Sequence, residues 1–180
     1  MKNWTPAAAL AIKHPPASLS QLALTVIESE NGFDPDFGVE FAVSCKTCNH
    51  AVFKFSGFPT VVPDPSPYVG LRPGQTLLLS PHNLKCVNCG NVAKAFDART
   101  DGYDGILNGG NAYESGTDGE AFVAGTFNIT ITVVYNNDLE EQIEPAKEAG
   151  VQPSDLFDSF VIRGTPVGDG KPFEEVYECA

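Results

Sequence analysis

Two turns with the same spacing decide how this chain folds, Cys45-Lys46-Thr47-Cys48 and Cys86-Val87-Asn88-Cys89. Each turn places two thiols three residues apart, and together they offer the four soft sulfur ligands that structural zinc sites use. Four protein ligands complete a tetrahedron and leave no position open for a substrate. We therefore predict one structural zinc ion per chain, with the ligands Cys45, Cys48, Cys86 and Cys89.

The residues around the two turns also match. Residues 45–55 can be laid over residues 86–96 at an offset of 41. Asn49 and Gly90 follow the second cysteine of each turn, where a residue that tolerates positive φ is useful. A strand-forming segment then leaves each turn and ends at Phe55 or Phe96. The match predicts two similar knuckles that face each other across the metal.

Other uses of the cysteines stay open on sequence grounds. The two turns could carry free thiols or a pair of disulfides, although the chain shows neither a signal peptide nor a disulfide-dense small scaffold. A Cys-x-x-Cys turn can also be a thioredoxin-type redox site, which needs a helix N-terminus after the first cysteine to lower its pKa. Strand-forming residues follow both turns here, so the sequence favours zinc over redox chemistry.

With these four cysteines and their flanking strands, the chain resembles zinc-ribbon-like proteins. It resembles more narrowly the β-tent group, which includes Yippee proteins and the ligand-binding domain of cereblon. The resemblance implies two β-sheets that lean together over a zinc ion held by paired Cys-x-x-Cys turns. It does not imply a cereblon-like ligand pocket, because such a pocket needs a cage of tryptophans and Trp4 is the only tryptophan in the chain.

Alternating and β-branched residues predict several strands, at 22–27, 39–44, 51–55, 76–79, 92–96, 121–135 and 157–163. Residues 22–27 could also form a short helix capped by a preceding serine. We expect the strands at 39–44 and 51–55 to pair as a hairpin, the proline-rich residues 59–73 to form an extended loop, and the last strand to be 157–163. Residues 139–149 read as a helix ended by Gly150. The sequence therefore predicts a mainly β fold of antiparallel sheets with one or two short helices.

At 180 residues, the chain suits a single domain. We predict an N-terminal arm over residues 1–17 and one zinc-stabilised β-rich domain over residues 18–180. The only apolar run near the start, residues 7–12, is ended by Lys13 and by Pro15-Pro16 before a secretory core or a membrane span could be completed. We therefore expect a cytoplasmic protein without a membrane role.

The charge is uneven along the chain. The formal net charge is −12, and it divides into +1 for residues 1–100 and −13 for residues 101–180. A protein that binds nucleic acid normally needs clustered Lys and Arg, and no such cluster is present, so we do not expect nucleic acid as a partner. The acidic half is either a solvated surface or a docking face for a basic protein.

Several other residues could carry chemistry. His50 and His82 lie close to the cysteines in sequence and could bind the metal or the sulfurs, although a lone histidine beside a zinc knuckle is usually a supporting residue. The Asp/Gly/Asn-rich residues 97–111 could hold Ca²⁺ or a polar ligand, but their spacing does not match an EF-hand loop. Cys179 is read as a free thiol. No set of residues forms a convincing nucleophile and base, so an enzyme is not the first expectation.

Three hypotheses of function follow. The leading one is a zinc-binding protein-interaction module that recognises another protein through loops or its acidic C-terminal half. The second is an acidic inhibitor or immunity-type protein that neutralises a basic enzyme, with Asp155 and Asp158 beside Phe157 and Phe160 as contacts. The third is an enzyme or small-ligand receptor that uses the 97–111 loop with His50 and His82.

Overall fold

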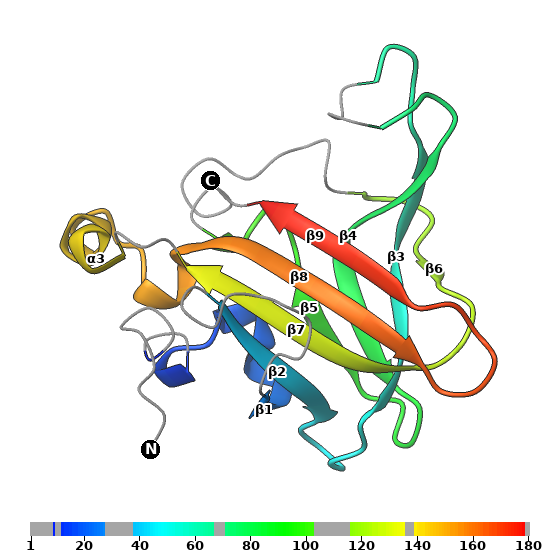
Figure 1. The fold of residues 1–180 in the computed structure, drawn as a ribbon, viewed down its shortest axis with the longest axis horizontal. Helices are drawn as coiled ribbons and strands as arrows, with labels where there is room; N and C mark the ends of the chain where they lie inside the picture. The colour runs from blue at the N-terminus through cyan, green and yellow to red at the C-terminus, as the bar shows by residue number, and fades with distance from the viewer. Residues whose placement is uncertain are drawn as a thin grey trace.

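A computed structural model describes residues 9, 12–27, 38–66, 71–102, 116–135 and 139–178. Nine strands make up about half of the described chain (Figure 1). They are β1 (Leu22–Ile27), β2 (Gly38–Cys45), β3 (Val52–Val61), β4 (Thr76–Cys86), β5 (Val92–Phe96), β6 (Ala121–Phe122), β7 (Phe127–Tyr135), β8 (Phe157–Pro166) and β9 (Phe173–Glu178). The helices whose bounds the structure describes are α3 (Leu139–Glu148) and two short 3-10 helices, η1 (Ala17–Gln21) and η3 (Pro153–Asp155).

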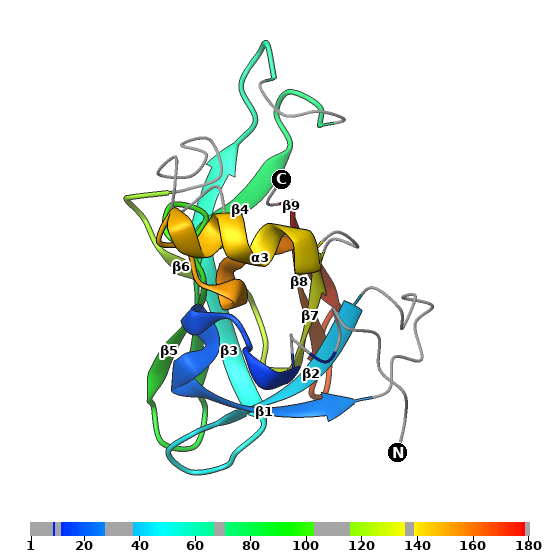
Figure 2. The same ribbon diagram turned by 90° about the vertical axis from the view of Figure 1, so that its left-hand side faces the viewer.

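The strand β7 is the centre of the sheet. One of its edges pairs with β8 over its whole length, and β8 pairs in turn with β9. On its other edge, Phe127 and Asn128 pair with β3, whereas residues 130–134 pair with β2. The order β3-β4-β5 thus branches from one end of β7, and β2-β1 from the other. Figure 2 shows β3, β4 and β5 on one side and β8 and β9 on the other, with α3 across the end nearest the viewer.

All of these strand pairs are antiparallel, which confirms the predicted fold class. The predicted strand at 22–27 is β1, so the helical alternative for that segment is wrong. The predicted helix is α3, and its end is also as expected. Gly150 has φ +81, and its N–H and that of Val151 bond the carbonyls of Lys147 and Ala146 in the Schellman pattern.

One strand pairing was predicted wrongly. The strands on either side of the first cysteine turn, β2 and β3, do not form a hairpin with each other, because β7 lies between them in the sheet order. β2 pairs with β1 and β7, and β3 pairs with β4, β6 and β7. Sequence spacing favoured the nearest partner, but both strands pair with the mostly buried β7, which is distant in sequence.

The loop expected at residues 59–73 begins later than predicted. β3 continues through Pro59 to Val61 and pairs there with Thr76 to Leu78 of β4. Proline lacks the N–H that a ladder needs, so it is confined to positions where that side of the strand is unpaired. No described strand pairs with the other side of β3 at Pro59, which is why the ladder tolerates it.

The strand predicted at 76–79 continues to Cys86 as β4, and two further departures lie near the end of the chain. The predicted strand at 121–135 is interrupted between β6 and β7, where Gly125 has φ +112 and the chain changes partner. The strand predicted at 157–163 extends to Pro166 and is not the last one, because β9 follows it. The alternation of Phe173, Glu175 and Tyr177 with exposed residues was the missed signal for β9.

Aromatic rings fill the space between the strands β3-β4-β5 and the strands β8-β9. The ring of Phe173 on β9 stacks on Phe55 of β3 at 4.3 Å between centroids, and Phe160 of β8 stacks on Phe96 of β5 at 4.9 Å. Gly164 allows this packing, since a Cβ at that position would lie 2.0 Å from the Phe173 ring. One buried apolar cluster extends from Leu19 to Tyr177. Among the described residues, no helix is long and apolar enough to cross a membrane.

Candidate metal centre

The two cysteine turns have the same backbone geometry. We call residues 45–50 the first knuckle and residues 86–91 the second knuckle. In the first knuckle, Asn49 N–H donates to Cys45 O at 2.7 Å, and Cys45 N–H donates to His50 O at 2.9 Å. In the second knuckle, the equivalent bonds join Gly90 to Cys86 at 3.0 Å and Cys86 to Asn91 at 2.8 Å.

The residue after each second cysteine adopts the expected left-handed conformation. Asn49 has φ +57 and is the only described non-glycine residue with positive φ, and Gly90 has φ +73. Asparagine and glycine are the residues that adopt this conformation at the lowest cost. The prediction of two similar knuckles at an offset of 41 residues is therefore confirmed in its backbone details.

The four thiols converge on one point between the knuckles. Cys45 ends β2 and Cys86 ends β4, and all four sulfur atoms lie within 4.8 Å of one another. Cys45 Sγ is 3.6 Å from Cys89 Sγ, and Cys48 Sγ is 3.6 Å from Cys86 Sγ. The two turns lie side by side at the lower edge of the molecule (Figures 1 and 2). Within the described parts of the chain, these four cysteines are the one group of residues placed so that they could hold a metal ion.

The thiols differ in exposure and in acidity. Cys45 and Cys86 are buried, Cys48 is half-buried and Cys89 is exposed. Hydrogen bonds from the Asn88 side chain and the His50 backbone N–H lower the pKa of the Cys48 thiol to about 6. The Asn91 N–H acts in the same direction on Cys89, but burial and the three neighbouring cysteine sulfurs together raise the pKa of that thiol to about 12. Without a cation, Cys89 therefore keeps its proton at pH 7.

This donor set fits a metal ion that prefers soft ligands. A divalent cation would replace the protons that remain on the cysteine thiols and would hold all four sulfurs as thiolates. Backbone N–H groups that bond the sulfurs are the usual support of such sites, and Asn88 adds a side-chain donor from the opposite knuckle. Sequence reasoning missed Asn88, although its place between Cys86 and Cys89 was the available signal. The four cysteines could hold one metal ion in a closed site.

Neither histidine joins this group. His82 lies on β4 with none of its surface exposed, its Nδ1 is 3.4 Å from Ser56 O, and its Nε2 is hydrogen-bonded to Tyr177 Oη. Burial lowers the pKa of His82 to about 4, so the ring is neutral at pH 7. His50 is half-buried and contributes its backbone carbonyl to the first knuckle. His82 is therefore part of the aromatic core, and His50 stabilises the first knuckle through its backbone.

The acidic residues that the sequence singled out have mostly structural contacts. Asp101 Oδ2 accepts the Asp97 N–H at 2.8 Å, and Asp97 Oδ1 accepts the Arg99 N–H at 3.1 Å, so both carboxylates close the turn after β5. The rest of the predicted ligand loop, residues 103–111, lies outside the described residues, as does Cys179.

The contacts expected at Asp155 to Phe160 need correction. Phe157 and Phe160 are 1% and 0% exposed, so they cannot meet a partner. Burial raises the pKa of both Asp155 and Asp158, which lie beside these rings. The register of β8 shifts at Asp158, between the pairs Ser159–Val134 and Phe157–Tyr135, so both phenylalanines enter the core although they are three residues apart. A sequence without the register of β8 does not show this.

No protein-family model, no curated protein and no solved structure matches the chain.

Proposed function

We propose that this protein is a cytoplasmic, zinc-stabilised interaction module that binds another protein. The observation that carries the proposal is the convergence of Cys45, Cys48, Cys86 and Cys89 within 4.8 Å. Four thiolates suit zinc better than harder cations such as Mg²⁺ or Ca²⁺. Because all four positions are taken by protein sulfurs, the ion acts on the fold and not on a substrate.

The arrangement of the strands also supports a relation to the β-tent group. The strands β3-β4-β5 and the strands β8-β9 both connect to β7, and aromatic side chains of the two groups pack against each other. The two knuckles lie together at one edge of the molecule (Figures 1 and 2). In such a protein the metal fixes the ends of β2 and β4, and the binding surfaces lie elsewhere on the framework. Reduced thiols are the normal state in the cytoplasm, where we place the protein.

The helix α3 offers the acidic docking surface. Glu141, Glu144 and Glu148 are exposed and recur at helical spacing, so they lie on one face. Lys147 pairs with Glu144 at 2.7 Å, but both side chains are more than half exposed, and the ion pair is therefore weak. A partner with a basic surface could exchange these solvent contacts for its own lysines and arginines.

A capture experiment tests this function. Tagged full-length protein is cross-linked to its partners in cell extract, and the partners are identified by mass spectrometry. The combined variant Glu141→Gln/Glu144→Gln/Glu148→Gln should lose the partner, and added salt should release it from the wild type. The matched variant Asp64→Asn/Asp118→Asn/Glu178→Gln changes the net charge equally at other exposed positions and should keep it.

The outcomes separate the hypotheses. Equal binding by the helix variant and the wild type would refute α3 as the docking surface. A captured basic enzyme that loses activity on binding would identify the protein as an inhibitor. Turnover of a substrate by the purified chain without zinc would contradict the interaction module. The buried position of His82 weighs against an active site built on that residue.

A further inference from the structure

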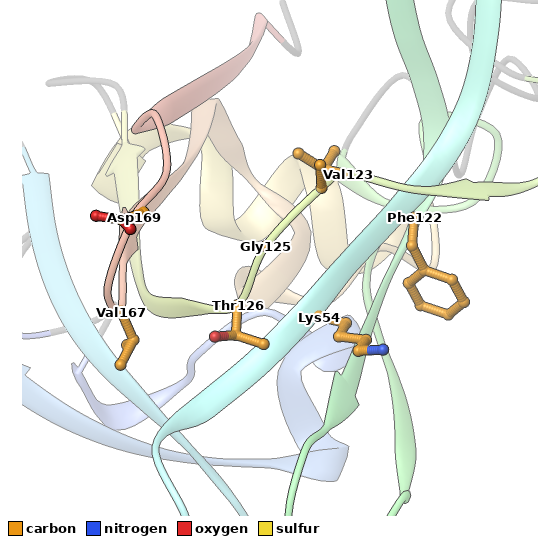
Figure 3. A pocket seen from close by; sticks show the side chains of 8 residues that line it. Lys54, Phe122, Val123, Gly125, Thr126, Val167 and Asp169 are labelled. Carbon is orange, nitrogen blue, oxygen red and sulfur yellow. The ribbon is translucent and has the colours of Figure 1, made fainter.

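A groove on the outer side of β3 has features that the proposed function does not use. The groove has a volume of about 440 Å³, within the range of small-ligand sites. Its walls come from β3, the segment between β6 and β7, and the turn between β8 and β9. Figure 3 shows Lys54 and Phe122 on one side of Gly125 and Thr126, and Val167 and Asp169 on the other.

One end of the groove is positive in a protein of net charge −12. Lys54 pairs directly with Lys85 in the β3–β4 ladder, so both side chains lie on the same face of the sheet. Like charges that are directly opposite repel each other, and neither lysine has an ion-pair or hydrogen-bond partner within the described residues. An anionic group bound at Lys54 would relieve this repulsion.

The middle of the groove is apolar and has unpaired backbone groups. Phe122 pairs with Ser56, which lies two residues from Lys54, so Phe122 is on the face that carries the lysines. Phe122 is 50% exposed and Val167 is 46% exposed, and both line the groove. The backbone N–H groups of Ala124 and Gly125 have no acceptor within the described residues. They could donate to a carboxylate or to a peptide oxygen.

The opposite end of the groove is negative. Asp169 is exposed in the turn between β8 and β9 and has no ion pair within the part of the chain that the structure describes. A ligand that fits all three regions therefore has an anionic end, an apolar body and a cationic end. Such a zwitterion has no net charge, so the overall acidity of the protein does not repel it.

We propose that this groove binds a short apolar peptide with free ends, its carboxylate at Lys54 and its amino group at Asp169. The side chains of the peptide would cover Phe122 and Val167, whose exposure is otherwise unfavourable. The site is separate from α3 and does not depend on the proposed protein partner.

The dipeptide Leu-Leu is the probe. It is titrated into the folded, metal-loaded full chain, and the amide signals of Gly125 and Val167 are followed by NMR. We expect saturable shifts with a Kd below about 1 mM. The C-terminal amide of Leu-Leu and its N-acetyl form each lack one charge, and each should bind at least roughly tenfold more weakly.

Variants of the protein test where the carboxylate and the amino group of the peptide bind. Lys54→Met should weaken Leu-Leu binding about tenfold, whereas Lys147→Met on α3 should leave it unchanged. Asp169→Asn should weaken the binding of Leu-Leu but not that of the N-acetyl form, which has no ammonium group. This difference identifies Asp169 as the partner of the amino group.

Three results would overturn the proposal. The first is the absence of saturable shifts around the groove up to about 10 mM peptide. The second is equal binding of Leu-Leu and its amide, because a carboxylate would then contribute nothing. The third is loss of the metal from Lys54→Met, because the lysine pair would then serve to balance the charge of the neighbouring thiolates. None of these results bears on the capture of a protein partner through α3.

Discussion

The first and second knuckles share their backbone hydrogen bonds, yet the strands that leave them have different partners. β2 and β3 leave the first knuckle for the middle of the sheet, where they pair with opposite ends of β7. β4 and β5 leave the second knuckle as a paired hairpin, and β5 is an edge strand. Local hydrogen bonds and the four thiols thus define the turn, whereas contacts far away in sequence define the strand pairing.

The two knuckles also differ in how far their residues are exposed to solvent. In the first knuckle, Cys45 is buried and Cys48 is half-buried. In the second, Cys89 is exposed, and Val87 and Val92 beside it are 42% and 51% exposed. We expect the second knuckle to tolerate changes at Cys89 better, because water can reach this ligand, although Cys86 is buried, and because β5 pairs with only one described strand.

The largest effect should come from the buried ligand of the first knuckle. Cys45→Ser should remove the metal and cost at least about 4 kcal/mol of folding free energy, since serine is a poor ligand and water cannot enter. Cys89→Ser should cost roughly half as much, because water can take the fourth position. Urea unfolding and metal content measure both effects.

Cys179→Ser is the control for these two variants, because the sequence predicts a free thiol at this position. It should leave both the metal content and the unfolding midpoint unchanged. A Cys89→Ser variant as unstable as Cys45→Ser would show that exposure does not distinguish the knuckles.

The sequence predicted the part of the site that is local. The thiol spacing, the positive φ of Asn49 and Gly90, and the strands that follow were all readable, because each depends on residues within one turn. The branching of the sheet at β7, the burial of His82 and the groove beside Lys54 were not readable. Each of these depends on which distant strands pair and in which register, and one sequence contains no direct signal for that.

A second prediction concerns a group outside both knuckles. Burial raises the pKa of Glu175 on β9 to about 7, above its ordinary value of 4.5. The folded state therefore binds this proton more tightly than the unfolded state. Its stabilising contribution is full below about pH 4.5 and is lost as the pH rises through about 7.

Glu175→Gln should therefore stabilise the protein at pH 8 by on the order of 2 kcal/mol, and by little at pH 4. Metal release on acidification should be unchanged in this variant, because protonation of the thiolates causes it. Thermal melts across this pH range, with metal content in parallel, separate the two effects. An equal change in stability at both pH values would mean that Glu175 is not the titrating group.

The smallest effects should come from exchanging the residues that follow the second cysteines. Gly90→Asn should be nearly neutral, since asparagine already holds the equivalent position at residue 49 with φ +57. Asn49→Gly should likewise change stability by less than about 0.5 kcal/mol. Gly90→Val should cost about 1–2 kcal/mol, because a β-branched residue is strained at φ +73.

No atom lies within 4 Å of the position that a Cβ would take at Gly90, so a steric clash does not enter this comparison. The free energy of unfolding of each variant is measured with urea. If Gly90→Asn were as costly as Gly90→Val, the two knuckles would not be equivalent at this position.

The metal content of the purified full chain tests the central claim most directly. Elemental mass spectrometry should find one zinc per chain, and a chelator should lower the melting temperature steeply as it removes the ion. A folded chain without metal, with four reactive thiols or two disulfides and a melting temperature that the chelator does not change, would contradict the structural zinc site.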